Sequence, residues 1–361
     1  MNVLENKRLS QLFKSFSNEK LLIPSIQIEV TKDGRHRIST NISKKNVFFE
    51  SKTNLVPDAT AFACAFLFPA LKSNAHLIIE GKVHAHWLQN VDTISNYANN
   101  WWGFPTPNIT AHTKEASSPP NNAALFFTGG VDSFYSLLNT PRKLCALIFI
   151  EGYDVPIKDR NRLMKVRSRL SNIASIKKVE LITIRTNIRE HKYFNRVGWP
   201  ITHGAALAAA GYCLSNHFRY FYIASTDVTG PHGSHPELDN KWSSGQIFFI
   251  NHGVDKSRLE KVAAIVQDDL VAQHLRVCWQ NTSEDLNCGV CEKCVRTQFQ
   301  IFCAKPDFFQ HQNCFPKSDP KNLLSNIKII PSHLKKQWND ICKNIGDQKL
   351  KRSIQSILHN N

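Results

Sequence analysis

Residues 123–133 read AALFFTGGVDS, a short apolar run that ends in a polar turn with two adjacent glycines. Residues 134–138, FYSLL, continue the stretch with apolar positions at helical spacing. A strand, a glycine turn and a helix start in this order bring backbone N–H groups and the positive end of the helix dipole to one point. The stretch therefore predicts a phosphate-binding loop at the carboxyl end of a buried strand.

The side chains of this loop suit an anionic ligand. Thr128 and Ser133 carry hydroxyls that can donate to phosphate oxygens, and Gly129 and Gly130 let the backbone approach the ligand closely. Asp132 suits either a magnesium site or a helix cap. The loop lacks both the Gly-Lys-Ser/Thr ending of a Walker loop and the Gly-x-Gly-x-x-Gly dinucleotide fingerprint. We therefore expect Thr128, Gly129, Gly130, Val131, Asp132 and Ser133 to bind the phosphate groups of a ligand.

Downstream of the loop, apolar runs at 144–150, 179–184 and 221–224 read as further buried strands. Helical patterns around 163–173 and 205–214 separate them. Alternating strands and helices favour an α/β fold with a doubly wound, mainly parallel sheet. In such sheets ligands bind beyond the carboxyl ends of the strands, which is where the glycine loop falls.

The region before residue 116 has a different pattern. An antiparallel sheet is predicted by alternating apolar and polar residues at 26–30, by the Asp33-Gly34 turn signal and by a strand near 47–49. An apolar helix is predicted after Asp58. A small, polar segment with two prolines separates this region from the loop. The predicted organisation is an N-terminal α+β domain at 1–115, a linker at 116–122, an α/β domain at 123–277 and a metal-binding, helical region at 278–361.

Four of the ten cysteines, Cys278, Cys288, Cys291 and Cys294, have the spacing C-x9-C-x2-C-x2-C. A tetrahedral thiolate site takes some ligands from a tight turn and another from a nearby segment, and this spacing supplies both. Zinc is the expected metal, in a structural role, and an iron–sulfur cluster is the alternative that also accepts four thiolates. The other cysteines, mostly in apolar surroundings, read as core residues.

The glycine loop resembles the PP-loop of ATP pyrophosphatases, with Thr128 where that family usually has serine. A PP-loop followed by this cysteine spacing, Arg296 and Phe299 is similar to the 7-cyano-7-deazaguanine synthase family over about residues 123–302. The resemblance implies a sheet of the adenine nucleotide alpha hydrolase type and the cofactors ATP, Mg²⁺ and Zn²⁺. It also implies that a carboxylate, such as 7-carboxy-7-deazaguanine, is activated as acyl-AMP with release of pyrophosphate and is then joined to ammonia or an amine.

The same resemblance implies roles for single residues. Asp132 and Ser133 become the catalytic pair of the loop, and Ile150 and Glu151 occupy the second strand-end loop at the nucleotide. At two segments this chain departs from the family: it has Thr202-His203 in place of Arg-Asn, and Gly233-Ser234-His235 in place of Asp-Cys-Arg. The weaker substrate-binding candidates are His203, Asp227, His235 and Glu237.

Three other functions stay open. Some relatives in bacterial antiviral defence attach a deazaguanine to a protein, and the additional N-terminal domain favours a protein acceptor. Forty-five Lys and Arg against 29 Asp and Glu give a net charge of +16, which keeps RNA modification open with tRNA as substrate. A non-catalytic nucleotide-binding module is the third alternative.

Length and composition exclude several classes of protein. The 361 residues, 42% of them hydrophobic, suffice for two domains with sizeable cores. No run reaches the roughly 18 apolar residues that cross a bilayer, and residues 1–7 carry charge early, unlike a signal peptide. We therefore expect a cytoplasmic protein without a membrane partner, and an oligomer stays open.

Overall fold

The computed structural model describes residues 19–115, 118–226, 230–281, 285–317 and 320–359. The candidate residue Asp227 and the first two residues of the expected linker, Ala116 and Ser117, lie outside the described residues. The chain divides into two compact units. The first contains Met1–Pro120, Arg185–Arg219 and Pro231–Phe249, and the second contains Asn121–Ile184, Tyr220–Gly230 and Ile250–Asn361.

The fold is α/β, with a parallel sheet of three strands and a mixed sheet of eight. In the first unit, β2 (Gln27–Val30), β3 (His36–Ile42) and β4 (Lys45–Ser51) pair antiparallel, which confirms the expected hairpin. The three-stranded sheet has the order β1-β5-β6 and was not expected from the sequence pattern. Its strands are β1 (Lys20–Ile23), β5 (His76–His84) and β6 (Asn108–Lys114).

The apolar helix α2 (Ala59–Lys72) is the centre of the first unit. Residues 59–71 are all buried, so this helix needs neighbours on every side. Helix α7 (Trp199–Tyr212), rich in buried alanine, packs against it and supplies one such neighbour. This packing explains why Arg185–Arg219 belongs to the first unit, although the sequence pattern places it within the α/β region. The other helices of this unit are α3 (Ala85–Trp102), α6 (Lys192–Val197) and α8 (Pro236–Asp239).

A buried charge network secures the start of α2. Asp58 caps the helix by accepting the N–H of Thr60 at 2.8 Å, and its other oxygen lies 2.7 Å from His84 Nε2 and 3.1 Å from Lys114 Nζ. Burial alone would raise the pKa of this carboxyl. The hydrogen bond and charge of His84, together with Lys114, outweigh burial and lower the pKa below its usual 3.8.

Asp58→Asn should therefore cost stability in a pH-dependent way. Asparagine keeps the helix cap but removes the charge, and breaking a buried ion pair costs about 3–5 kcal/mol. Because the folded-state pKa is lowered, the contribution of Asp58 is present above the unfolded-state pKa and is lost as pH falls through the folded-state value. Urea titrations should show the largest difference between wild type and variant near pH 7 and a shrinking one below pH 4. An equal difference at both pH values would contradict this account.

The second unit contains the strands that follow the linker, in the order β11-β10-β7-β8-β9. The first of these along the chain, β7 (Ala123–Phe126), is parallel to both β8 (Leu144–Glu151) and β10 (Tyr220–Ala224). Their carboxyl ends therefore meet at one edge of the sheet, and β7 lies between the later strands. Ligands bind at such a point in open α/β sheets. Strand β9 (Glu180–Thr186) begins in the second unit and ends in the first, and β11 (Phe248–His252) begins in the first and ends in the second.

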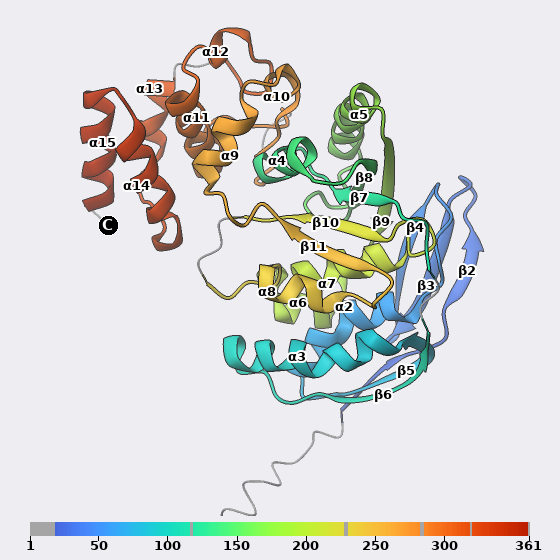
Figure 1. The fold of residues 1–361 in the computed structure, drawn as a ribbon. Coiled ribbons are helices and arrows are strands. Elements are labelled where there is room, and N and C mark those ends of the chain that lie inside the picture. The colour runs from blue at the N-terminus through green and yellow to red at the C-terminus, as the bar shows by residue number, and fades with distance from the viewer. Residues whose placement is uncertain (1–18, 116–117, 227–229, 282–284, 318–319, 360–361) are drawn as a thin grey trace, which may run out of the picture. The chain divides into compact units, whose positions relative to one another are not determined.

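Two apolar clusters hold the helices of the second unit. One joins β7 and β8 to α4 (Val131–Asn139), α5 (Arg160–Lys177) and α9 (Arg258–Ile265) and includes Cys278, Cys291 and Cys294. The other joins one side of α11 (Glu292–Ala304) to the fully buried Trp338 and to the helices of the C-terminal region, which Figure 1 shows. The remaining helices are α10 (Asp269–His274), α12 (Phe308–His311), α13 (Pro320–Leu323), α14 (Lys335–Asn344) and α15 (Gln348–His359). Among the described residues, no helix is both long enough and apolar enough to cross a bilayer.

Candidate functional site

The glycine loop has the geometry of an anion-binding turn. Gly129 has φ +77°, a left-handed conformation that favours glycine, and Gly130 is the N-cap residue of the nine-residue helix α4. Because Gly130 has no side chain, the N-cap residue offers no side-chain oxygen to accept the first-turn N–H groups of α4. The Ser133 hydroxyl donates to the Gly130 carbonyl at 3.0 Å, within the loop. The backbone of Arg276 donates to the Gly129 carbonyl at 2.7 Å and fixes the turn from outside.

Asp132 lies in the first turn of α4, with its side chain 21% exposed, and both of its carboxylate oxygens face cations. Arg258 Nη1 lies 2.8 Å from one oxygen, and Lys261 Nζ lies 3.3 Å from the other. Burial would raise the pKa of Asp132, but the charges of Arg258 and Lys261 outweigh it and lower the pKa. Asp132 is therefore ionised, and in this structure it orients two basic side chains.

The basic side chains near Asp132 carry more positive charge than its one carboxylate can balance. The side chain of Lys261 is fully buried and also donates to the Ser225 carbonyl, just after β10, at 2.7 Å. Arg258 is 4% exposed, and its Nε has no hydrogen-bond partner in the described part of the chain. Lys293, from α11, is a third cation within electrostatic range of Asp132. Burial, and secondarily the charge of Arg258, lowers the pKa of Lys293. The site carries an excess of positive charge that an anion would balance.

The second predicted nucleotide segment, Ile150-Glu151, ends β8 at the same edge of the sheet as the loop. Both residues are buried, and Glu151 Oε1 lies 3.1 Å from Arg167 Nε of α5. Because β7 and β8 are parallel neighbours, this segment and the loop follow adjacent strands. The structure thus brings together the predicted loop and strand-end residues of the second unit.

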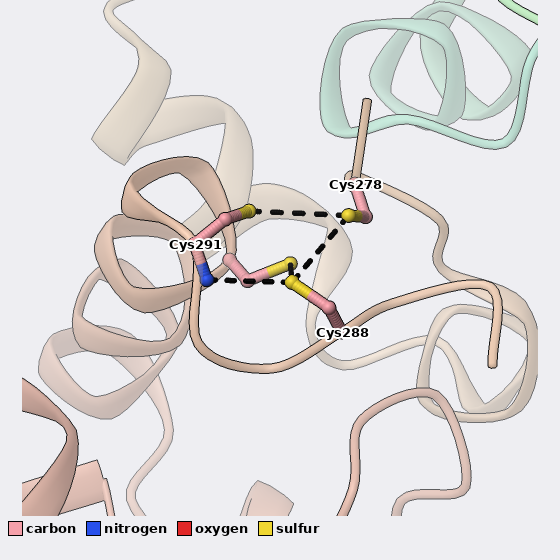
Figure 2. A group of neighbouring side chains, drawn as sticks. Cys278, Cys288 and Cys291 are labelled. Atoms are coloured by element: carbon pink, nitrogen blue, oxygen red, sulfur yellow. Dashed lines mark hydrogen bonds between the residues drawn. The ribbon is translucent and has the colours of Figure 1, made fainter. Parts of the chain in front are cut away.

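The four cysteines of the C-x9-C-x2-C-x2-C motif converge, with all four sulfur atoms within 4.8 Å of one another. Figure 2 shows Cys278, Cys288 and Cys291 pointing toward one another, with a Cys278–Cys288 sulfur distance of 3.6 Å and a Cys278–Cys291 distance of 3.9 Å. A tetrahedral zinc with sulfur ligands at about 2.3 Å needs sulfur separations of about 3.8 Å. All four cysteines are free thiols, so the cluster can hold a metal such as zinc.

The thiols of this cluster already favour a thiolate. The hydrogen bond from Cys294 lowers the pKa of the Cys291 thiol to about 5, whereas the hydrogen bond to Cys291 raises the pKa of Cys294. Four thiolates in one place repel one another unless a cation joins them. This donor set therefore suits a thiolate-binding divalent metal.

Asn287 joins the cysteine cluster to the glycine loop. Its Oδ1 accepts the N–H groups of Val277 at 2.7 Å and Cys278 at 3.0 Å, and its Nδ2 donates to the Leu275 carbonyl at 2.8 Å. The clamped segment contains Arg276, whose N–H holds the Gly129 carbonyl. One short segment thus contacts the loop at one residue and supplies a cysteine of the cluster two residues later.

The weaker candidates His203, His235 and Glu237 lie in the first unit. The ring of His203 packs 4.9 Å from Trp199, the ring of His235 packs 4.9 Å from Trp101, and Glu237 is exposed. The two segments that depart from the family lie side by side, because Gly233 donates to the Pro200 carbonyl at 2.8 Å. These residues belong to the first unit, whereas the glycine loop belongs to the second.

Several residues of the site escaped the sequence analysis. Each is a basic or amide side chain; Asn287 and Lys293 lie within the cysteine motif, and the others belong to no motif. Arg258 and Lys261 are three residues apart in a helix that begins with a Ser257/Glu260 capping box, and this spacing places them on one face. That is the only local signal they offer. The residues concerned are Arg258, Lys261, Arg276, Asn287 and Lys293.

Comparison with protein-family models, with curated proteins and with solved structures gives no match to this chain.

Proposed function

We propose that the chain is an ATP-dependent adenylating enzyme of the PP-loop type, similar to the 7-cyano-7-deazaguanine synthases. The observation that carries the proposal is the positively charged N-terminus of α4, where Arg258 and Lys261 pair with Asp132 and Lys293 lies within electrostatic range. The turn with Gly129 and Gly130 follows β7 at the edge where three parallel strands end. A polyphosphate is the ligand that both the helix N-terminus and the excess charge favour.

The proposed reaction activates a carboxylate. A carboxylate oxygen of the substrate attacks the α-phosphorus of ATP, the bond between the α-phosphorus and the bridging oxygen breaks, and pyrophosphate leaves. The acyl-AMP then reacts with ammonia or an amine, and AMP departs. Charge accumulates on the leaving pyrophosphate, and Arg258 and Lys261 are placed to balance it. Asp132 holds these two cations in position.

The proposed magnesium ion enters with the phosphates of ATP. Magnesium keeps several waters and binds through few carboxylates and substrate phosphates, so it needs no dedicated protein site. Both oxygens of Asp132 already face cations. The role that we propose for Asp132 is therefore to position Arg258 and Lys261 rather than to be the main magnesium ligand.

The test combines the zinc-loaded protein with MgATP, ammonium and 7-carboxy-7-deazaguanine labelled with heavy oxygen in its carboxylate. We expect pyrophosphate release that depends on the carboxylate and AMP that carries one labelled oxygen, because that oxygen bridges carbon and phosphorus in the acyl-AMP. Mass spectrometry of AMP and of the purine product identifies both. Unlabelled AMP, or release of ADP and phosphate, would overturn the proposed chemistry.

A protein amine is the second candidate acceptor, favoured by the first unit. Within the part of the chain that the structure describes, strand β2 is the last strand of the sheet, and its residues Ile28 and Val30, on one face, are each 65% exposed. An open strand edge with an apolar face can pair with a strand of another protein. Adenylation without transfer to ammonium, together with labelled purine attached to a partner protein, would favour this acceptor.

A further inference from the structure

The cysteine motif carries a lysine in an unexpected place. Lys293 lies between Cys291 and Cys294, in the first turn of α11, where the positive end of the helix dipole disfavours a cation. A lysine at this position has to be stabilised by something other than its own helix.

The neighbours of Lys293 give the direction of its side chain. Thr297 lies four residues later, on the same face of α11, and its hydroxyl lies 3.4 Å from Arg258 Nη2. Arg258 in turn pairs with Asp132, so this face of α11 is turned toward the first turn of α4. Helix α9, which carries Arg258, contacts both α4 and α11 (Figure 1).

Lys293 has no counter-charge of its own among the described residues. The carboxylate of Asp132 is already engaged by Arg258 and Lys261, and the other carboxylate in electrostatic range, Asp154, is exposed. Within the described residues, Lys293 makes no hydrogen bond and no ion pair. Lys293 is thus a further cation within electrostatic range of the first turn of α4, where Arg258 and Lys261 already pair with Asp132.

We infer that Lys293 binds a phosphate oxygen of the nucleotide and that the cysteine cluster, by ordering the turn before α11, sets its position. The inference rests on the proposed function and extends it. The metal site, besides supporting the fold, then supplies a ligand-binding residue. The Asn287 clamp, which connects Cys278 to the backbone that holds Gly129, is a second connection between the same two sites.

Lys293→Met tests the first half of the inference. The probe is the magnesium complex of α,β-methylene-ATP, which cannot lose pyrophosphate, and the measurement is its Kd by calorimetry. We expect the variant to keep its zinc and to bind the probe about 10- to 100-fold more weakly, the range for a hydrogen bond to a charged group. Lys293→Arg should recover part of the affinity. Lys305→Met, at the other end of α11, is the matched control and should bind like wild type.

The outcomes separate the two claims. If wild type binds the probe and Lys293→Met binds it equally well, the inference is wrong and the proposed function stands. If wild type does not bind the probe, both are wrong.

The second half predicts a reciprocal effect on the metal. Two linked sites stabilise each other equally, so the bound probe should slow the removal of zinc by a chelator from wild type. In Lys293→Met this protection should be smaller at probe concentrations that saturate the variant, because only the connection through the Asn287 clamp remains. Equal protection in both proteins would contradict a connection through Lys293. The protection is measured as the rate of zinc release, which requires no assay of activity.

Discussion

Replacing both Cys288 and Cys291 by serine will remove the metal and destabilise the second unit. The cysteine cluster lies within the larger apolar cluster of that unit, where Cys278, Cys291 and Cys294 are buried. Without a metal, four close thiols lose their common ligand and the turn before α11 loses its anchor. We expect zinc content to fall from about one per chain to near zero and stability to fall by about 4 kcal/mol or more, or about 10 °C in Tm.

Cys145→Ser is the matched control, because Cys145 is an exposed cysteine of β8 that lies outside the cluster. It should keep both zinc and Tm. Elemental analysis of the purified proteins and thermal unfolding measure the two effects. Full zinc content in the double variant, or iron in place of zinc in wild type, would contradict the zinc assignment, and iron would favour the iron–sulfur alternative.

Asp132→Asn should separate nucleotide binding from reaction. The substitution keeps the shape of the side chain but removes the charge that holds Arg258 and Lys261. The site becomes more positive, so we expect the Kd for MgATP to stay the same or decrease. Pyrophosphate release should fall by about 100-fold or more, because the two cations are no longer held where charge develops in the transition state.

The same substitution should reduce stability by about 3–5 kcal/mol, because it leaves two buried cations without a counter-charge. ATP that binds to the folded variant should restore part of this loss. Asp255→Asn is the control, because Asp255 is exposed and pairs only loosely with Lys256 at 3.9 Å. If the folded Asp132→Asn protein released pyrophosphate at the wild-type rate, our assignment of the loop would be wrong.

Much of this protein follows from local sequence. The run at 123–133 contains its strand, its turn and the start of its helix within a few residues, so spacing alone predicts β7, the loop and α4. The cysteine motif is similarly compact, and the four sulfur atoms meet as expected. The hairpin in the first unit and the helix after Asp58 also agree with their patterns. In each case the decisive contacts join residues that are close in the chain.

Local patterns therefore predict the glycine turn, the helix starts, several strands and the set of thiols. Which distant side chains complete the site depends on the folded arrangement of the chain. Asp132 pairs with Arg258 and Lys261, which lie more than a hundred residues later in the chain. Helix α7, which the sequence pattern places in the α/β region, packs against α2. Periodicity reports which face of an element is apolar, but it contains no information about partner elements. Those partners are selected by the packing of buried faces and by the need to pair buried charges, which are properties of the folded chain as a whole.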